Sequence, residues 1–150
     1  MQPKRGLIIK KKFDSSHFLN GYQGNCANVH GHTYHLDLYL TFKQKPLNEL
    51  NMLVDFKTVD EIIEVVVKRY DHQLINALPP YGHPNLGEKH ESLKEMYQTD
   101  FNPTAEFMAE TMFKEINLAL QHGLEVSYNV LEKIVIWETD KYAASYELVP

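Results

Sequence analysis

The chain of 150 residues contains a single cysteine, no long apolar run and no excess of positive charge. One cysteine cannot form an internal disulfide, which favours a reducing compartment, and we expect a cytoplasmic protein. Because the apolar runs are shorter than a membrane-spanning helix and no apolar signal stretch follows the N-terminus, no membrane partner is expected. The formal net charge of −5 argues against nucleic acid as a partner, since phosphate binding relies on clustered cations.

Hydrophobic residues make up 43% of the chain, which is enough for a folded domain with a buried core. The length fits one domain over residues 1–150. Residues 6–13 are predicted as a first strand, and alternating leucines and polar residues predict a half-buried second strand over 30–42. Two more strands are predicted near the C-terminus, over 130–137 and 143–149.

Two helices are predicted between these strand pairs. Apolar residues recur at helical spacing over 58–70, and Thr58 with Glu61 fits a capping box at the start of that helix. A second helix is predicted to open at 102–104, with Pro103 in its first turn and Gly123 as its stop. The stretch 78–101 between the helices is rich in proline, glycine and charge, which predicts a surface insertion or a short extra helix.

The predicted order β-β-α-α-β-β defines an α+β fold, with an antiparallel four-stranded sheet and two helices beside it. Strand pairs at both ends of the chain favour antiparallel hairpins. Such a sheet leaves two edges open. Open edges are commonly closed by another subunit, so we expect a homo-oligomer.

A candidate metal site lies where the first two predicted strands meet. His30 and His32 project from one face of their strand, because successive side chains alternate between faces. The same alternation places them on the side of the strand's leucines, unless a bulge intervenes. His17 follows the first strand, and antiparallel pairing would bring it beside His30. Three imidazoles with one open position are typical of a zinc site that does chemistry.

The single cysteine, Cys26, lies among glycine and asparagine residues, and three residues separate it from His30. A free cysteine is usually a small buried hydrophobe, but this loop composition favours a functional thiol. It is either a fourth zinc ligand, which would close the site and make it structural, or a base held off the metal. The residues alone leave both interpretations open.

Two carboxylates near other candidate groups complete the set. Asp71 directly precedes His72 after the first predicted helix, and a carboxylate beside an imidazole can orient it for a proton relay. A solvated surface pair is the alternative. Glu138 ends an apolar strand, where it is either solvated or an anchor for a ring that carries N–H donors.

Six short segments of this chain together resemble the 6-pyruvoyltetrahydropterin synthase and 6-carboxytetrahydropterin synthase family. They are 13–17 (FDSSH), 26–34 (CANVHGHTY), 54–56 (VDF), 70–76 (YDHQLIN), 102–106 (NPTAE) and 137–139 (WET). The resemblance implies that family's tunnelling fold (T-fold), in which the sheets of three subunits join into a barrel. It also implies trimers, usually stacked into hexamers, with active sites between subunits.

The resemblance implies a zinc enzyme. His17, His30 and His32 look like the family's ligands of Zn²⁺, and Cys26 looks like its proton-abstracting base. The short spacing from Cys26 to His30 is similar to that of the 6-carboxytetrahydropterin synthase branch, which serves biosynthesis of the modified base queuosine. The branch that makes the 6-pyruvoyl product tends to have a longer spacing.

The resemblance also implies residues for proton transfer and for substrate binding. Asp71 and His72 resemble the family's proton relay. Glu138 resembles the carboxylate that anchors the pterin ring and is counted with the relay. Thr104 and Glu106 lie in the segment that helps line the pterin pocket.

The implied reaction converts 7,8-dihydroneopterin triphosphate into 6-carboxy-5,6,7,8-tetrahydropterin and releases acetaldehyde and triphosphate. The chain has no glycine-rich phosphate loop, which fits triphosphate as a leaving group and not as an energy source. Two alternatives stay open. One is the 6-pyruvoyl branch of the same family, and the other is a non-catalytic zinc module in which Cys26 and the three histidines all bind the metal.

Overall fold

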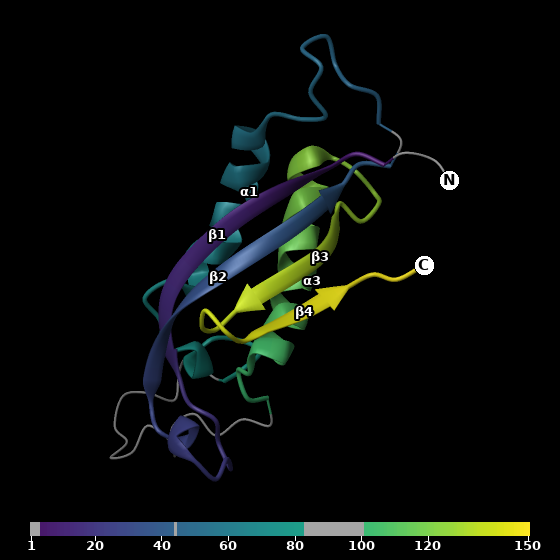
Figure 1. Cartoon of the computed structure of the whole chain (residues 1–150). Coiled ribbons are helices and arrows are strands. Elements are labelled where there is room, and N and C mark those ends of the chain that lie inside the picture. Colours follow the sequence, from purple (N-terminus) through teal and green to yellow (C-terminus); the bar gives the residue numbers. More distant parts are fainter. Residues whose placement is uncertain (1–3, 44, 83–100) are drawn as a thin grey trace.

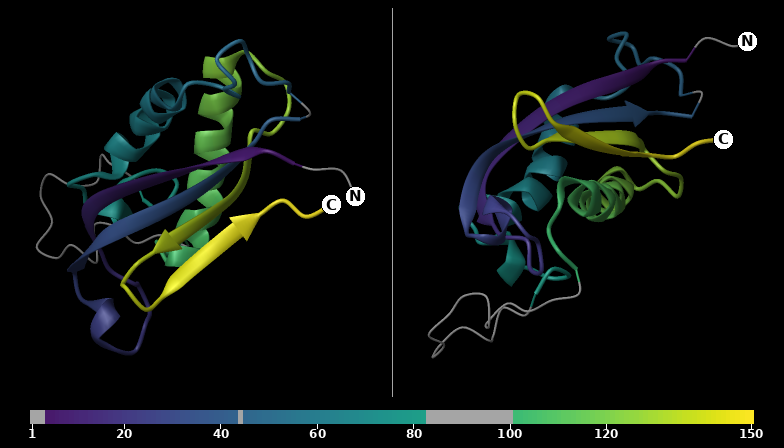
Figure 2. Two further views of the ribbon diagram at one scale, coloured as in Figure 1. Left: turned by 45° about the horizontal axis from the view of Figure 1, so that its top comes forward. Right: turned by 60° about the horizontal axis from the view of Figure 1, so that its bottom comes forward.

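The computed structural model describes residues 4–43, 45–82 and 101–150. Its antiparallel sheet has the order β1-β2-β3-β4. The strands are β1 (Gly6–His17), β2 (His30–Thr41), β3 (Leu131–Trp137) and β4 (Ala143–Glu147). Both long helices, α1 (Phe56–Tyr70) and α3 (Ala105–Leu124), lie on the same side of the sheet, as Figure 1 and Figure 2 show. This arrangement confirms the predicted α+β fold and its element order.

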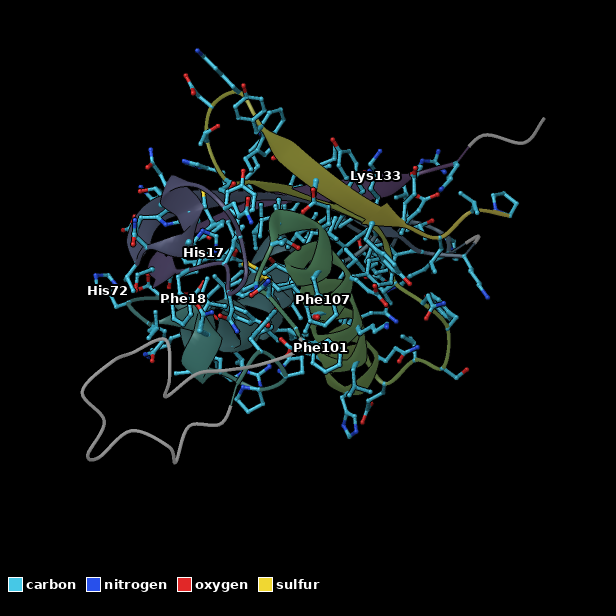
Figure 3. All side chains as sticks on the ribbon, turned by 90° about the horizontal axis from the view of Figure 1, so that it is seen from below. His17, Phe18, His72, Phe101, Phe107 and Lys133 are labelled. Carbon is cyan, nitrogen blue, oxygen red and sulfur yellow. The ribbon has the colours of Figure 1, made fainter. Side chains whose placement is uncertain are left out.

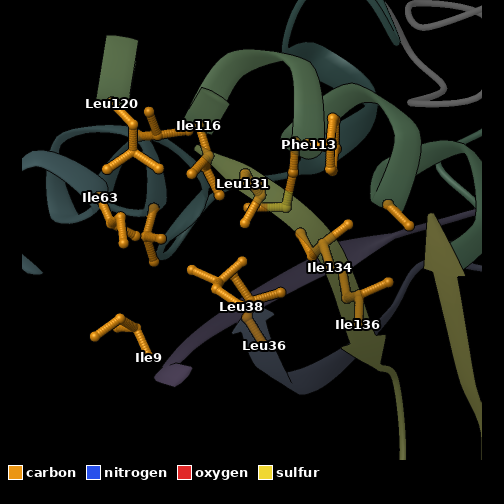
Figure 4. Packing of buried hydrophobic residues seen from close by; sticks show 14 of the residues in the cluster. Ile9, Leu36, Leu38, Ile63, Phe113, Ile116, Leu120, Leu131, Ile134 and Ile136 are labelled. Atoms are coloured by element: carbon orange, nitrogen blue, oxygen red, sulfur yellow. The ribbon is translucent and has the colours of Figure 1, made fainter. Parts of the chain in front are cut away.

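The face of the sheet that α1 and α3 cover, called here the helix-covered face, carries the hydrophobic core. On β2 the side chains of Leu36 and Leu38 are fully buried, and on β3 those of Ile134 and Ile136 are. Figure 4 shows these residues packed against Ile116 and its neighbours on α3. Burying a side chain of this size stabilises the fold by about 1.5–3 kcal/mol. Burial of these alternating apolar side chains is therefore the main driving force for packing the helices on the sheet.

The first strand is longer than predicted, because it continues past residue 13 to His17. Its pairing with β2 has no bulge, so the alternation of faces continues to the end of the strand. Ser15 is buried on the helix-covered face, where its hydroxyl contacts the carbonyl of Tyr70. This contact satisfies a polar side chain that the sequence pattern placed beyond the strand. His17 therefore arrives on the same face as His32.

The start of α1 corrects the predicted capping box. Asp55 is the N-cap, and its carboxylate accepts a hydrogen bond from the backbone N–H of Lys57 at 2.8 Å. Thr58 and Glu61 both lie inside the helix, so neither caps it. The prediction was wrong because a second capping residue stands three positions earlier.

The ends of α3 also differ from the prediction. Thr104 is its N-cap, and Pro103 precedes the helix instead of lying in its first turn. The helix continues one residue past Gly123, and Glu125 ends it with a left-handed φ of 53°. Gly123 has a packing role instead, because a Cβ at this position would lie 2.6 Å from Cδ1 of Ile62 on α1. The glycine lets the two helices approach closely.

The remaining boundaries agree with the prediction to within two residues. β3 begins at residue 131 and β4 ends at residue 147. Most of the stretch predicted as an insertion or extra helix, residues 83–100, lies outside the described residues. Within the described ranges, no helix combines the length and apolar character needed to cross a bilayer.

Candidate metal centre and active site

Three imidazoles converge at the end of the sheet where β1 finishes and β2 begins. The ring nitrogens Nε2 of His17 and His30 are 3.0 Å apart. One ring nitrogen from each of His17, His30 and His32 lies within 4.8 Å of the others. The cluster forms because His17 and His30 are paired in register across the two strands, and His32 is two residues further along the same face. The predicted grouping of the three histidines is confirmed.

Backbone carbonyls orient two of these rings. Nδ1 of His17 lies 2.8 Å from the carbonyl oxygen of Pro103, and Nδ1 of His30 lies 2.7 Å from that of Asn28. A carbonyl only accepts, so each Nδ1 carries the proton that is donated. In the neutral rings, both Nε2 atoms are then unprotonated and direct their lone pairs into the cluster. Metal-binding histidines typically have this arrangement.

Burial favours the neutral form of His17 and His32. His17 is 1% exposed, and its burial lowers the pKa of the imidazole to about 4. Burial also lowers the pKa of His32. Lone pairs of neutral rings repel each other when they meet at about 3 Å, unless a cation lies between them.

The carboxylate of Glu138 lies beside these ring nitrogens, and its negative charge also favours a cation at this point. Oε1 of Glu138 lies 3.3 Å from Nε2 of His17 and 3.5 Å from Nε2 of His32. Nε2 of His32 is buried and has no hydrogen-bond partner among the described residues. An unpaired buried nitrogen beside two inward-facing lone pairs fits a divalent metal, and imidazole nitrogens suit zinc. These residues therefore fit the metal predicted from the sequence.

The position of Glu138 follows from the periodicity of β3. Ile134 and Ile136 point to the helix-covered face, and Glu138 continues the same alternation just beyond the strand. A hairpin turn holds it there, because its backbone N–H donates to the carbonyl of Tyr142 at 3.0 Å. The residue predicted as a strand-end carboxylate thus lies beside the histidines instead of in solvent.

Tyr34 is a neighbour of the cluster that the sequence reasoning missed. Its hydroxyl oxygen lies 3.3 Å from Nδ1 of His17, and the side chain is fully buried. Burial, the largest cause, and the nearby Glu138 raise the pKa of the phenol, so the hydroxyl stays protonated. The signal was available, because Tyr34 follows His32 by two residues and shares its face of β2.

Cys26 lies outside the group of converging nitrogens. It is half-buried in a short 3₁₀ turn, η1 (Asn25–Ala27), and its thiol is free. The ligand atoms that approach one another within 4.8 Å belong to the three histidines, and among the described residues the thiol is not one of them. The geometry favours a thiol held off the metal over the closed four-ligand site.

Asp71 and His72 form a contact at the outer edge of β1. Nδ1 of His72 lies 2.9 Å from Oδ2 of Asp71, and this carboxylate raises the pKa of the imidazole. Asp14 is a third member that the sequence reasoning missed. Its backbone N–H donates to Oδ1 of Asp71 at 3.0 Å, which lowers the pKa of that carboxyl. The backbone N–H of His72 in turn donates to the carbonyl of Asp14 at 2.6 Å.

A cavity of about 580 Å³ lies at this edge of the sheet, and of the three histidines only His32 is among its lining residues. His32, His72 and Gln73 all line it. Figure 3 shows His17 inside the molecule and His72 at its periphery. The cavity is open to one side, and its volume is in the range of small-molecule sites.

Two predicted pocket residues lie at the start of α3. The hydroxyl of Thr104 caps the helix by accepting from the backbone N–H of Phe107 at 3.2 Å. Glu106 is exposed in the first turn. Their suggested place in a pterin pocket stays a prediction.

A buried three-histidine cluster beside an open cavity defines a candidate metal-dependent enzyme of the α+β class. The model of one protein family, described as 6-pyruvoyl tetrahydropterin synthase, matches residues 7–148. The chain belongs to this family. The family and its named relatives indicate an enzyme of the lyase type.

Several curated relatives share the sequence pattern. The 6-carboxy-5,6,7,8-tetrahydropterin synthase of Rickettsia bellii is 35% identical over 108 residues, which cover 70% of this chain and 75% of the relative. The enzyme of the same name from Haemophilus influenzae is 29% identical over 143 residues, which cover 90% of this chain and 93% of the relative.

Solved structures share the fold. The 6-pyruvoyl tetrahydropterin synthase of Caenorhabditis elegans superposes with a TM-score of 0.68 at 19% identity, covering 98% of this chain and 97% of that one. The enzyme of that name from Plasmodium falciparum has a TM-score of 0.61 at 15% identity, covering 99% of this chain and all of that one, 100%. At these identities the likeness concerns the fold alone.

Proposed function

We propose that this chain is a zinc-dependent 6-carboxy-5,6,7,8-tetrahydropterin synthase that acts in queuosine biosynthesis. Its substrate would be 7,8-dihydroneopterin triphosphate. The observation that carries the proposal is the convergence of three imidazoles beside the Glu138 carboxylate. The names of the curated relatives support the 6-carboxy product over the 6-pyruvoyl product.

The three histidines would hold the metal, and the lowered pKa values of His17 and His32 favour the neutral rings that bind it. Zinc bound there supplies Lewis acidity, which polarises oxygen atoms of the substrate's side chain. Pro103 and Asn28 contribute through their carbonyls, because these fix the tautomers of His17 and His30. Glu138 would accept hydrogen bonds from N–H groups of the pterin ring.

Proton transfer falls to residues off the metal. Cys26 as thiolate would remove a proton from a side-chain carbon of the substrate. Asp71 holds the proton on Nδ1 of His72, so that Nε2 is free to exchange a proton with the substrate on another side. His72 lines the same cavity as His32, which supports a place for this relay beside the metal cluster.

The reaction balances without an external redox cofactor. The dihydropterin ring takes up the electrons that the adjacent side-chain carbon loses when it becomes a carboxylate. Cleavage of the next carbon–carbon bond releases acetaldehyde, triphosphate departs as an anion, and one water supplies the added oxygen. The absence of a nicotinamide-binding motif in the sequence is consistent with this chemistry.

Assembly into trimers, with hexamers formed from two of them, is part of the proposal. The support is the open sheet. β4 is the last strand of the described sheet, and β1 forms its other edge. Pairing between such edges of neighbouring copies would satisfy their free backbone groups. Sedimentation analysis of the zinc-loaded protein tests it, and a monomer would overturn it.

The central test is mass spectrometry of the products formed from 7,8-dihydroneopterin triphosphate by zinc-loaded protein. We expect 6-carboxytetrahydropterin and acetaldehyde, and the metal-free protein serves as control. The 6-pyruvoyl product would instead assign the chain to the other branch. No turnover by an oligomer with full zinc content would overturn the enzymatic proposal and favour a non-catalytic zinc module.

A further inference from the structure

The segment that leaves β1 is held by two asparagine side chains from distant parts of the chain. The amide of Asn76 accepts from the backbone N–H of Phe18 and donates to the carbonyl of Phe18, both at 2.9 Å. The amide of Asn102 does the same for Asn20, at 2.8 Å and 2.9 Å. Each amide thus makes the pair of hydrogen bonds that a neighbouring strand would make.

This segment, residues 18–20, connects the metal-binding end of β1 with the loop that carries Cys26, called here the cysteine loop (residues 21–29). Phe18 and Asn20 turn their backbone groups toward the two asparagines. Leu19, between them, turns its N–H the other way and donates to the carbonyl of Cys26 at 2.8 Å. Because each residue of the segment is fixed from one side or the other, the base of the cysteine loop has a defined position relative to the end of β1.

Asn102 also belongs to the segment that orients a metal ligand. The next residue, Pro103, is buried, and its carbonyl contacts Nδ1 of His17. The carbonyl of Asn102 accepts from the N–H of Thr104, which caps α3. One short stretch therefore holds both a histidine of the metal cluster and the segment that carries the thiol, and α3 anchors it.

We propose that Asn102, together with Asn76, is a positioning residue that fixes the thiol of Cys26 relative to the three-histidine cluster. The assignment rests on the proposed function, in which this thiol is the base. Neither asparagine touches the thiol, so both act through the backbone of 18–20. Proton transfer depends steeply on placement, and a misplacement of about 1 Å can cost about 100-fold in rate.

The test compares Asn102→Ala with the wild type. Asn48→Ala is the matched control, because the Asn48 amide also holds a loop by two hydrogen bonds to the backbone, its oxygen accepting from the N–H groups of Leu50 and Met52 at 2.9 Å each. Asn76 is fully buried, so its replacement risks unfolding, whereas Asn102 is partly exposed. Each protein is compared at equal zinc content.

Cys26 is the single thiol of the chain, so its alkylation by iodoacetamide at fixed pH reports on this loop alone. In Asn102→Ala we expect faster alkylation than in the wild type and in Asn48→Ala, because the freed loop exposes the half-buried thiol. We also expect kcat to fall about 10- to 100-fold with KM nearly unchanged, because the Asn102 amide bonds the backbone of Asn20 and does not line the cavity.

The two readouts separate this proposal from the proposed function. If the wild type makes no product, the proposed function fails, and the alkylation rates alone still test the asparagine contacts. If the wild type turns over and Asn102→Ala matches Asn48→Ala in both alkylation and kcat, the positioning role is overturned. A fall in zinc affinity with unchanged alkylation would also overturn it, because Asn102 would then act on His17 and not on the thiol.

Discussion

The helix-covered face is apolar along the middle of the sheet and polar at the end where β1 finishes, although the same strand pair builds both regions. In the middle, Leu36 and Leu38 are fully buried and need only close packing. At the end, Ser15, His17 and His32 take positions of the same alternation. Ser15 finds a backbone partner, whereas Nε2 of His32 has none among the described residues.

This difference separates what folds the chain from what the chain does. Burial of apolar side chains stabilises the fold, while a buried polar atom without a partner costs about 1–3 kcal/mol. Nε2 of His32 is such an atom, and the apolar region holds the strands in place around it. We therefore expect substitutions in the middle to change stability, and substitutions at the end to change metal binding and turnover.

The largest effect is expected for His32→Ala. Loss of one of three ligands should lower zinc affinity by more than about 100-fold. Mutating residues that only hydrogen-bond to metal ligands already lowers metal affinity by about 10- to 100-fold. Metal analysis after dialysis, together with turnover, measures it. The control is His35→Ala, because His35 is exposed on the opposite face of the same strand. Full zinc occupancy in His32→Ala would remove this residue from the ligand set.

Cys26→Ala should lower turnover by about 10²- to 10⁴-fold, the usual contribution of a general base, while zinc content and oligomeric state stay unchanged. The reason is that the thiol lies outside the ligand group. Two measurements on the same sample test this prediction. Product formation at saturating substrate gives the turnover, and metal analysis gives the zinc content. Near-full activity would show that the thiol is not the base, and loss of zinc would support the closed four-ligand site.

Leu38→Ala tests the apolar region. Removing this fully buried side chain should reduce the free energy of unfolding by about 2–5 kcal/mol, through lost burial and the cavity left behind. Chemical denaturation of the zinc-free protein measures it without a contribution from the metal. Ile8→Ala is the matched control, because Ile8 is 58% exposed on the other face, and its replacement should cost far less. Equal losses of unfolding free energy in the two variants would contradict the claim that burial on the helix-covered face stabilises the fold.

The smallest effect is expected for Asp71→Asn. The Asp71 carboxylate raises the pKa of His72, so an amide there should let that pKa fall back toward its ordinary value of 6.5. The wild-type imidazole therefore stays protonated to a higher pH than the variant imidazole. An NMR titration of the His72 ring protons measures the difference. Identical titration curves would show that Asp71 does not change the pKa of His72. Turnover of the variant should fall modestly, by about 10-fold.

Local periodicity predicted much of this molecule correctly. The alternation over β2 placed His30 and His32 on the face of the leucines, and the structure confirms that placement. The element order and most boundaries followed from the same patterns. The errors concern the ends of the strands and helices. Ser15 belongs to β1 because it pairs with His32 of β2, and Asp55 caps a helix that Thr58 was predicted to cap.

The sequence by itself determined the layered fold and the grouping of three histidines, because alternation is a local property of the chain and β1 and β2 are consecutive strands that pair with each other. Only the tertiary structure decided what surrounds that group. His17 meets the carbonyl of Pro103, 86 residues away, and also the carboxylate of Glu138. Periodicity sets the face on which Glu138 lies, but it does not encode which distant residue meets His17 there. These contacts exist because the packing of α3 and the hairpin after β3 against the sheet brings distant segments to one end of it.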